Sequence, residues 1–253
     1  MKIYQTKKNQ IILVGDIHGK FKDFEYEAHD RRKITDSLLI QLGDFGVGFI
    51  REEQDRKNVE ALNSRLAVSN NMMYVIRGNH DKPDYFDGSW EFSNLKLVKD
   101  YTIITVDGDD ILLVGGAISI DRRPRLAQMT EYAKYGQDRE NYWYDENFVL
   151  DKKRAHEIKG CRYVITHTAP DFCWPDNKNG FGSLVEHFIM IGDSKLKTEL
   201  PIERRNLTKL YNILKENNHI ETWFYGHFHR TELTQRDGVD FHLLDIQEIY
   251  GVK

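Results

Sequence analysis

Five short stretches of this sequence carry carboxylates, imidazoles and an amide at spacings that suit one shared ligand. Their polar residues are Asp16, His18, Asp44, Asn79, His80, His167, His227 and His229. Asp16 and His18 are two residues apart, so in an extended segment their side chains project to the same side. Oxygen and imidazole groups without thiolate suit divalent ions such as manganese, iron or zinc. Because a single catalytic zinc needs only three protein ligands, so large a set predicts two ions that share the Asp44 carboxylate.

An apolar run precedes each of these stretches, which predicts that each follows a strand. The runs are 11–14, 37–42, 72–76, 161–165 and 221–225. Apolar runs rich in branched residues are typical of strands covered on both faces. Helical spacing of apolar side chains is present at 21–33, 52–68 and 203–217. Right-handed parallel crossovers therefore predict that the first three polar loops meet at one edge of an α/β sheet, where such folds carry their chemistry.

The rest of the chain adds strands and a basic segment. Further strands are predicted at 95–98, 101–106, 111–114, 231–236 and 239–246. Arg122 and Arg125 could form a fork that grips a phosphate, although a solvated basic loop explains them equally well. Residues 126–156 are polar and aromatic, and they predict helices or a lid near the site. Residues 171–201 predict an irregular excursion with one short helix at 183–191.

Composition and length bound the class of protein. The 253 residues, 40% of them hydrophobic, predict one domain spanning 1–253, with residues 119–156 as a lid or insertion. With a formal charge of −4, the protein lacks the excess of basic residues that long duplex nucleic acid or an anionic membrane attracts. Cys161 and Cys173 are too few for a disulfide framework, which favours a reducing compartment. Since the apolar runs are also too short for a signal peptide or a membrane span, we expect a cytoplasmic protein.

Five motifs in order resemble the calcineurin-like metallophosphoesterase superfamily. They are Gly15-Asp16-Ile17-His18-Gly19, Gly43-Asp44, Gly78-Asn79-His80-Asp81, Thr166-His167 and Gly226-His227-Phe228-His229. The resemblance implies an α/β fold with four layers, α/β/β/α, in which two mixed sheets lie between helices. It also implies the ligand sets, which are Asp16, His18 and His229 for the first metal ion, Asn79, His167 and His227 for the second, and Asp44 as the bridge between them.

A mechanism follows from the same resemblance. Two ions roughly 3.5–4 Å apart lower the pKa of a bridging water and clamp the phosphate oxygens, so a hydroxide bridging the ions would attack the phosphorus. His80 would protonate the departing alkoxide, a role that suits an imidazole near neutral pH. In the protein phosphatase branch, the second motif continues to an aspartate and an arginine. Val47 and Gly48 stand at those places here, which disfavours a protein serine/threonine phosphatase.

Two classes of function stay open on the sequence alone. We favour a metal-dependent phosphoesterase that acts on a phosphodiester or phosphomonoester of a small molecule or nucleotide, because every ligand position and His80 are filled. The second class is a non-catalytic metal-binding scaffold on the same fold. A nuclease that acts on short single strands, aided by aromatic stacking, is a narrower alternative. The natural substrate, the native metals and the oligomeric state stay open.

Overall fold

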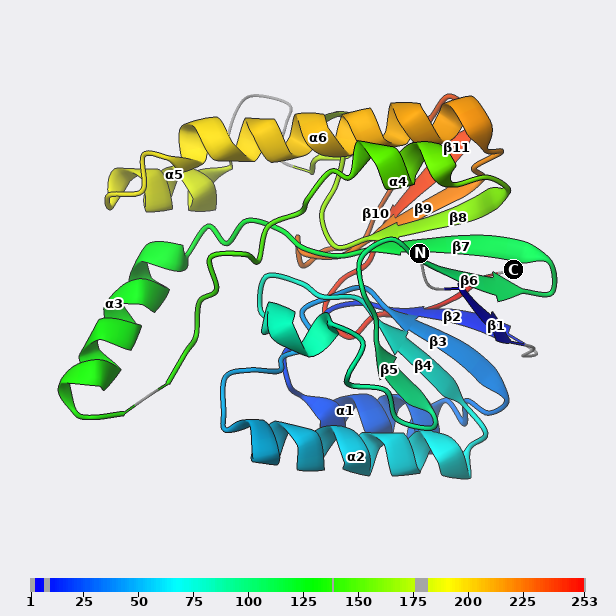
Figure 1. The fold of residues 1–253 in the computed structure, drawn as a ribbon, viewed down its shortest axis with the longest axis horizontal. Coiled ribbons are helices and arrows are strands. Elements are labelled where there is room, and N and C mark those ends of the chain that lie inside the picture. Colours follow the sequence, from blue (N-terminus) through cyan, green and yellow to red (C-terminus); the bar gives the residue numbers. More distant parts are fainter. Residues whose placement is uncertain (1–2, 7–9, 138, 176–181, 253) are drawn as a thin grey trace.

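Two mixed β-sheets form the centre of the structure, a computed structural model that describes residues 3–6, 10–137, 139–175 and 182–252. The smaller sheet contains β2 (Gln10–Val14), β3 (Ser37–Gln41), β4 (Met72–Val75), β5 (Leu95–Leu97) and β12 (Ile249–Val252). Its strand order is β12-β2-β3-β4-β5, and β2 to β5 run parallel to one another. The loops after β2, β3 and β4 therefore lie at the same edge of this sheet (Figure 1).

The larger sheet lies against the smaller one (Figure 1). It contains β1 (Ile3–Thr6), β6 (Thr102–Val106), β7 (Asp109–Val114), β8 (Cys161–Thr166), β9 (Thr222–Tyr225), β10 (Glu232–Arg236) and β11 (Val239–Leu243). The strand order is β1-β6-β7-β8-β9-β11-β10. Because β8 and β9 are parallel neighbours, the loops that follow them also share one edge.

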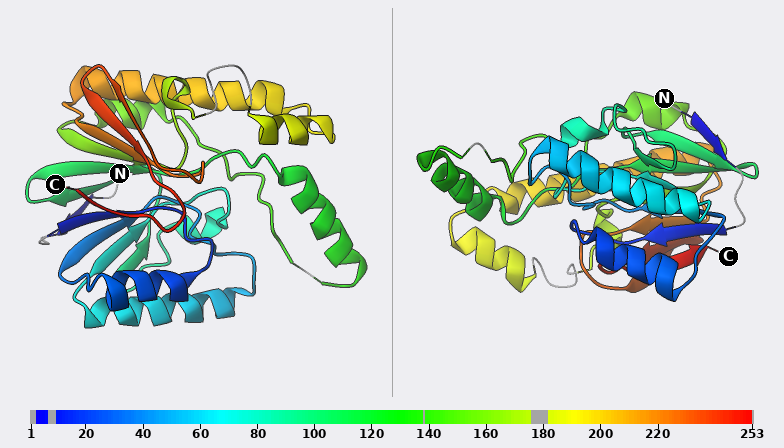
Figure 2. Two further views of the ribbon diagram at one scale, coloured as in Figure 1. Left: turned by 180° about the vertical axis from the view of Figure 1, so that it is seen from behind. Right: turned by 90° about the horizontal axis from the view of Figure 1, so that it is seen from below.

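Helices cover the outer face of each sheet, as Figures 1 and 2 show. The helices are α1 (Phe21–Glu25), which continues as a π-helical turn (Tyr26–Arg31), α2 (Glu52–Val68), α3 (Arg122–Lys134), α4 (Lys152–Glu157), α5 (Ser183–Met190) and α6 (Leu196–Asn217). The pair α1 and α2 covers the smaller sheet, and α4 and α6 cover the larger one, so the predicted four-layer fold is confirmed. In the described part of the chain, no helix is both long enough and apolar enough to cross a membrane.

Side chains of the central strands alternate between two apolar cores. In β3, Leu38 and Ile40 belong to the core between the sheets, whereas Leu39 belongs to the core that includes α1 and α2. A third core, which includes Leu207 and Leu210 of α6, lies on the outer face of the larger sheet. Burial on both faces explains why the strands are continuous apolar runs. Each fully buried leucine contributes about 1.5–3 kcal/mol to stability, so this layering fixes the strand ends firmly.

Helix α6 begins earlier than the sequence pattern predicts, at Leu196 instead of residue 203, and Pro201 lies inside it. Proline lacks the N–H group that would bond to the carbonyl one turn back. Leu196 and Leu200 are nevertheless fully buried in a small apolar core, and their burial outweighs the missing bond. The predicted irregular excursion therefore ends before α6, and residues 176–181 of that excursion lie outside the described residues.

Strands β1 and β12 were missed by the sequence pattern. Strand β1 lies at the edge of the larger sheet and pairs with β6, about a hundred residues further along the chain. Strand β12 returns from the end of the chain to pair with β2 in antiparallel orientation. Partners so distant in sequence leave no local periodicity that indicates a strand.

Residues 119–156 leave the larger sheet and return to it through α3 and α4, which confirms the helices predicted there. Figures 1 and 2 show α3 extending away from both sheets. The return segment contains buried Tyr142 and Trp143, and the Trp143 ring meets the Phe49 ring edge to face at 5.2 Å between centroids. These aromatic residues therefore pack within the protein. The lid function of 119–156 stays a prediction.

Asp55, near the start of α2, gives a test of this packing. Its buried carboxylate accepts a hydrogen bond from the Gly48 N–H at 2.8 Å, and burial raises its pKa to about 6. A folded-state pKa above the unfolded one means that wild-type stability falls as pH rises from about 4 to about 6. We expect the stability of Asp55→Asn relative to wild type to increase by on the order of 2 kcal/mol between pH 4 and pH 7. Urea unfolding at both pH values measures this, and a difference independent of pH would contradict it.

Candidate metal centre

Polar side chains from both sheets meet where parallel strands end. The residues singled out in the sequence are Asp16 and His18 after β2, Asp44 after β3, Asn79 and His80 after β4, His167 after β8, and His227 and His229 after β9. Six of these eight form two groups whose nitrogen and oxygen atoms lie within 4.8 Å of one another. The structure thus brings together side chains that are more than two hundred residues apart in the chain.

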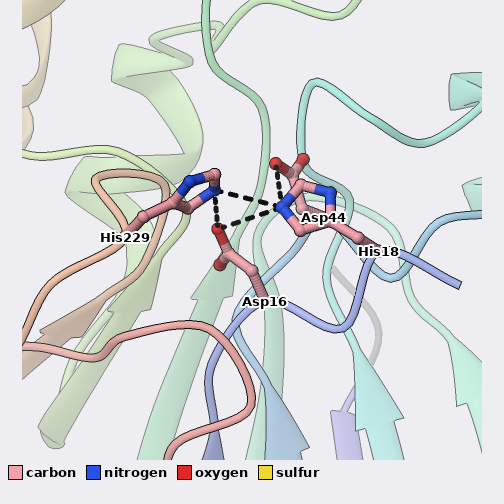
Figure 3. A group of neighbouring side chains, drawn as sticks. All are labelled: Asp16, His18, Asp44 and His229. Atoms are coloured by element: carbon pink, nitrogen blue, oxygen red, sulfur yellow. Dashed lines mark hydrogen bonds and ion pairs between the residues drawn. The ribbon is translucent and has the colours of Figure 1, made fainter. Parts of the chain in front are cut away.

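The first group contains Asp16, His18, Asp44 and His229, which Figure 3 shows pointing toward one another. The Nε2 atoms of His18 and His229 are 3.1 Å apart. Oδ2 of Asp16 lies 3.3 Å from Nε2 of His229 and 3.9 Å from Nε2 of His18. Oδ2 of Asp44 lies 3.7 Å from Nε2 of His18. Four ligand atoms from three loops therefore surround one small volume.

The second group contains Asp44, His167 and His227. Nε2 of His167 lies 3.2 Å from Oδ1 of Asp44 and 3.1 Å from Oδ1 of Asn79. Nδ1 of His167 donates to the Leu42 carbonyl at 2.7 Å, so in the neutral imidazole Nε2 presents its lone pair to the group. Asp44 thus turns Oδ2 toward the first group and Oδ1 toward the second, as a shared ligand would.

Four of these residues have backbone conformations that glycine adopts far more readily. The φ angle is +49° at His18, +53° at Asp44, +72° at His227 and +49° at His229. A non-glycine residue in this left-handed region costs on the order of 1–3 kcal/mol. Strain of this kind, placed at residues whose side chains converge, is typical of a functional site.

Buried negative charge characterises both groups. Asp16 is 0% exposed and Asp44 is 1% exposed, and both form ion pairs with histidines. Burial opposes ionisation of Asp44, but the charges of His167 and His80 hold its pKa well below the ordinary value. Burial alone would lower the pKa of His167, but the Asp44 carboxylate beside it raises that pKa to about 9. Ionised carboxylates beside facing imidazole nitrogens fit a divalent cation, which neutralises the former and accepts lone pairs from the latter.

Glycines in the motifs leave the space that these side chains occupy. A Cβ atom on Gly78 would lie 2.1 Å from Oδ1 of Asp44 and 2.8 Å from Nε2 of His167. A Cβ atom on Gly226 would lie 2.4 Å from Oδ1 of Asp16. The motif requires glycine at both positions because the backbone passes against the candidate ligands.

Asp81 connects the loops after β3 and β4, a role that its place beside His80 in the sequence did not reveal. Its carboxylate is 0% exposed and accepts the backbone N–H groups of Phe45 at 3.1 Å, Gly46 at 2.7 Å and Gly78 at 2.7 Å. Burial and the neighbouring Asp44 carboxylate raise the pKa of Asp81 to about 6. Asp81 therefore positions both loops without itself joining either group.

His80 lies beside both groups and belongs to neither. Its backbone N–H donates to Oδ1 of Asp44 at 2.7 Å, and its ring centroid is 5.2 Å from that of His18. With Asp44 and His227 it lines a cavity of about 440 Å³. Burial lowers the pKa of His80, and the Asp44 carboxylate partly opposes that change. The imidazole is thus placed to exchange a proton with a molecule in the cavity.

A buried network that the sequence did not indicate orients the Asn79 amide. Nδ2 of Asn79 donates to Oγ of Ser119 at 2.9 Å, which leaves Oδ1 for the second group. Ser119 in turn donates from Oγ to Glu146 at 2.9 Å, and from its backbone N–H at 2.7 Å. Arg125 donates to the Asn79 carbonyl and to Oγ of Ser119. Segment 119–156 therefore holds Asn79 in one orientation, although none of its residues belongs to the two groups.

The two arginines predicted to bind phosphate are engaged in contacts within the protein. Arg122 pairs with Asp193 and Glu199. Arg125 is buried beside Asn79, and its guanidinium lies 5.7 Å from the centroid of the Trp143 ring. Among the described residues that line the 440 Å³ cavity, neither arginine is present. Their binding of substrate stays a prediction, and the structure places Arg125 as a support for Asn79.

The protein phosphatase branch has additional polar residues at two positions that are tightly packed in this structure. Val47 is fully buried. Gly48 has a φ of +106°, and a Cβ atom there would lie 2.4 Å from Cβ of Lys82 and 2.9 Å from the Trp143 ring. An arginine at position 48 would have to displace both neighbours. That the protein is not a protein serine/threonine phosphatase stays a prediction from the sequence.

Comparison with known sequences shows which family the chain belongs to. The sequence model of the calcineurin-like phosphoesterases matches residues 10–231, a range that includes all five motifs. The chain therefore belongs to the calcineurin-like phosphoesterase family, whose members generally hydrolyse phosphoesters with divalent metal ions. Among curated proteins, none is similar enough to count as a match.

Three solved structures resemble the chain distantly. The anchor in the inner membrane complex of Plasmodium is 12% identical, with a TM-score of 0.44 over 93% of this chain and 71% of that chain. A putative 5'-nucleotidase from Staphylococcus aureus is 13% identical, with a TM-score of 0.48 over 95% of this chain and 49% of that chain. The phosphopantetheinyl hydrolase from Mycobacterium tuberculosis is 14% identical, with a TM-score of 0.43 over 95% of this chain and 90% of that chain.

Gly78→Ala tests whether the two groups hold metal. The added Cβ would lie against Asp44 and His167, so we expect manganese to bind about tenfold or more weakly in competition with a chelator. Gly251→Ala in β12 is the control, because no described atom lies within 4 Å of its added Cβ. Equal manganese affinity in the two variants would argue against a metal site at these residues.

Proposed function

We propose that this protein is a metal-dependent phosphoesterase that hydrolyses a phosphodiester or phosphomonoester of a small molecule or nucleotide. The observation that carries the proposal is the placement of Asp44 between two groups of candidate ligands, with its two carboxylate oxygens directed to different groups. His80 lies in the same cavity. The charge of −4 and the two free cysteines fit a cytoplasmic enzyme that does not act on long duplex nucleic acid.

We assign the candidate ligands to two divalent ions. Asp16, His18 and His229 would hold one ion, and Asn79, His167 and His227 the other, with Asp44 shared. The donor set suits manganese, iron or zinc. When bound, such ions lower the pKa of water and neutralise charge on the phosphate oxygens. The chain supplies their placement, through Asp81 for the two loops and Ser119 for the Asn79 amide.

His80 would act as the general acid that protonates the departing oxygen. Its imidazole lies beside the candidate ligands without being one of them, so its nitrogen stays available for proton transfer. Burial lowers the pKa of His80, which makes its protonated form a stronger acid. An anionic phosphate next to the ring would raise that pKa again and so favour the protonated form in the complex.

His80→Ala should keep both metals and lose turnover where the leaving group is poor. We expect a loss of about 10²–10⁴-fold on an alkyl phosphate ester and a much smaller loss on a p-nitrophenyl ester, whose leaving group needs no proton. His219→Ala is the control, since that side chain is 92% exposed and lies outside the site. Full activity of His80→Ala on the alkyl ester would remove His80 from this role.

The proposed function is tested by hydrolysis of bis-p-nitrophenyl phosphate and p-nitrophenyl phosphate. Protein stripped of metal should be inactive and should regain activity with manganese, whereas Asp44→Asn should stay inactive, because the shared ligand loses its charge. Turnover of the diester indicates a phosphodiesterase, and turnover of the monoester alone indicates a phosphatase. If neither substrate is hydrolysed by protein that is shown to contain metal, the result would contradict the proposal and favour a non-catalytic scaffold.

A further inference from the structure

The cavity that contains His80 is lined on one part by apolar side chains and on another by the candidate metal ligands. Its volume of about 440 Å³ is in the range of pockets that enclose a whole small organic ligand, and so it exceeds what a phosphate group fills. We call six of its residues the apolar wall. They are Ile120, Trp174, Leu184, Val185, Phe188 and Phe228. Candidate metal ligands and the apolar wall therefore share one cavity.

Packing behind the apolar wall holds it in place. The rings of Trp174 and Phe228 meet edge to face with centroids 4.6 Å apart. The Arg204 guanidinium lies 3.3 Å from the centroid of the Trp174 ring. Leu196 and Leu200 of α6 are fully buried and pack in the same core as Trp174. The early start of α6 thus supports the wall, which is a preformed surface.

Part of the apolar wall remains uncovered. Leu184 is 60% exposed, and Phe188 and Phe228 are partly exposed, so apolar surface is left next to strongly polar groups. Phe228 lies between His227 and His229 in sequence, so a molecule bound at these histidines lies close to the wall. Covering this surface with an apolar group is favourable, whereas a sugar there would lose hydrogen bonds to water that apolar side chains cannot replace.

We propose that the apolar wall receives the organic part of the substrate, and that the enzyme acts on phosphate esters of apolar alcohols, with an alkyl or aryl group, in preference to sugar phosphates. This inference rests on the proposed function and narrows its substrate class. Asp121 and Arg230 also line the cavity, so one acidic and one basic side chain lie near the apolar wall. The favoured ester carries an apolar group on the phosphate that the candidate ligands would hold.

Binding of alkylphosphonates to the manganese-loaded full-length protein tests the inference. These compounds present the same charged head and an alkyl chain, but their P–C bond is not hydrolysed. Calorimetric titration from methyl to hexylphosphonate should show the Kd falling about two- to fourfold per added CH₂ group. Affinity that does not change with chain length would overturn the inference.

Variants on α5 locate the effect. Leu184→Ala and Phe188→Ala should each weaken hexylphosphonate binding by about three- to tenfold and leave methylphosphonate binding unchanged. Met190→Ala is the matched control, since Met190 is 84% exposed on the same helix and is not among the residues that line the cavity. Equal losses in the control and in the two wall variants would contradict a role for the wall.

The titration, combined with the assay on p-nitrophenyl esters, separates failure of the inference from failure of the proposed function. A dependence on chain length without hydrolysis of any ester would support the wall as a binding surface and reject the phosphoesterase. Hydrolysis of p-nitrophenyl esters together with a flat alkylphosphonate series would support the enzyme and reject the wall.

Discussion

The buried carboxylate of Asp81 is the interaction on which the candidate metal centre depends most. It accepts backbone N–H groups from the loop after β3 and from the loop after β4, so it fixes how far apart these loops lie. Asp44 and Asn79 sit on those two loops. A carboxylate without such bonds would be costly to bury, and loops without such a carboxylate would leave several N–H groups unpaired. The loops and Asp81 therefore stabilise one another.

Several features around Asp81 are energetically unfavourable in the absence of a cation, and a divalent cation would offset them. Asp16 and Asp44 are buried carboxylates, and the Nε2 atoms of His18 and His229 face each other at 3.1 Å. Residues at positive φ add backbone strain. The strand ends hold these groups in place because three apolar cores fix the strands. Stability built elsewhere in the fold thus keeps a binding site in its strained arrangement.

The sequence predicted the parts of the structure that local pattern controls. Apolar runs followed by polar residues, with a glycine before the candidate ligand in four of the five stretches, marked the strand ends, and the candidate ligands lie in the loops after them. Ser119 could not be recognised as a partner of Asn79, because the two are 40 residues apart and nothing in the local sequence pairs them. The basic run containing Arg122 was visible, but its acidic partner Asp193 lies 71 residues away. Pro201 marked a helix boundary that tertiary burial overrode.

We propose that the ends of the two sheets form one centre for two metal ions that share Asp44. An anomalous difference map from a crystal of the manganese-loaded protein would locate the ions. We expect two peaks, one beside Asp16, His18 and His229 and one beside Asn79, His167 and His227, with Asp44 next to both. A single peak, or peaks away from Asp44, would contradict it.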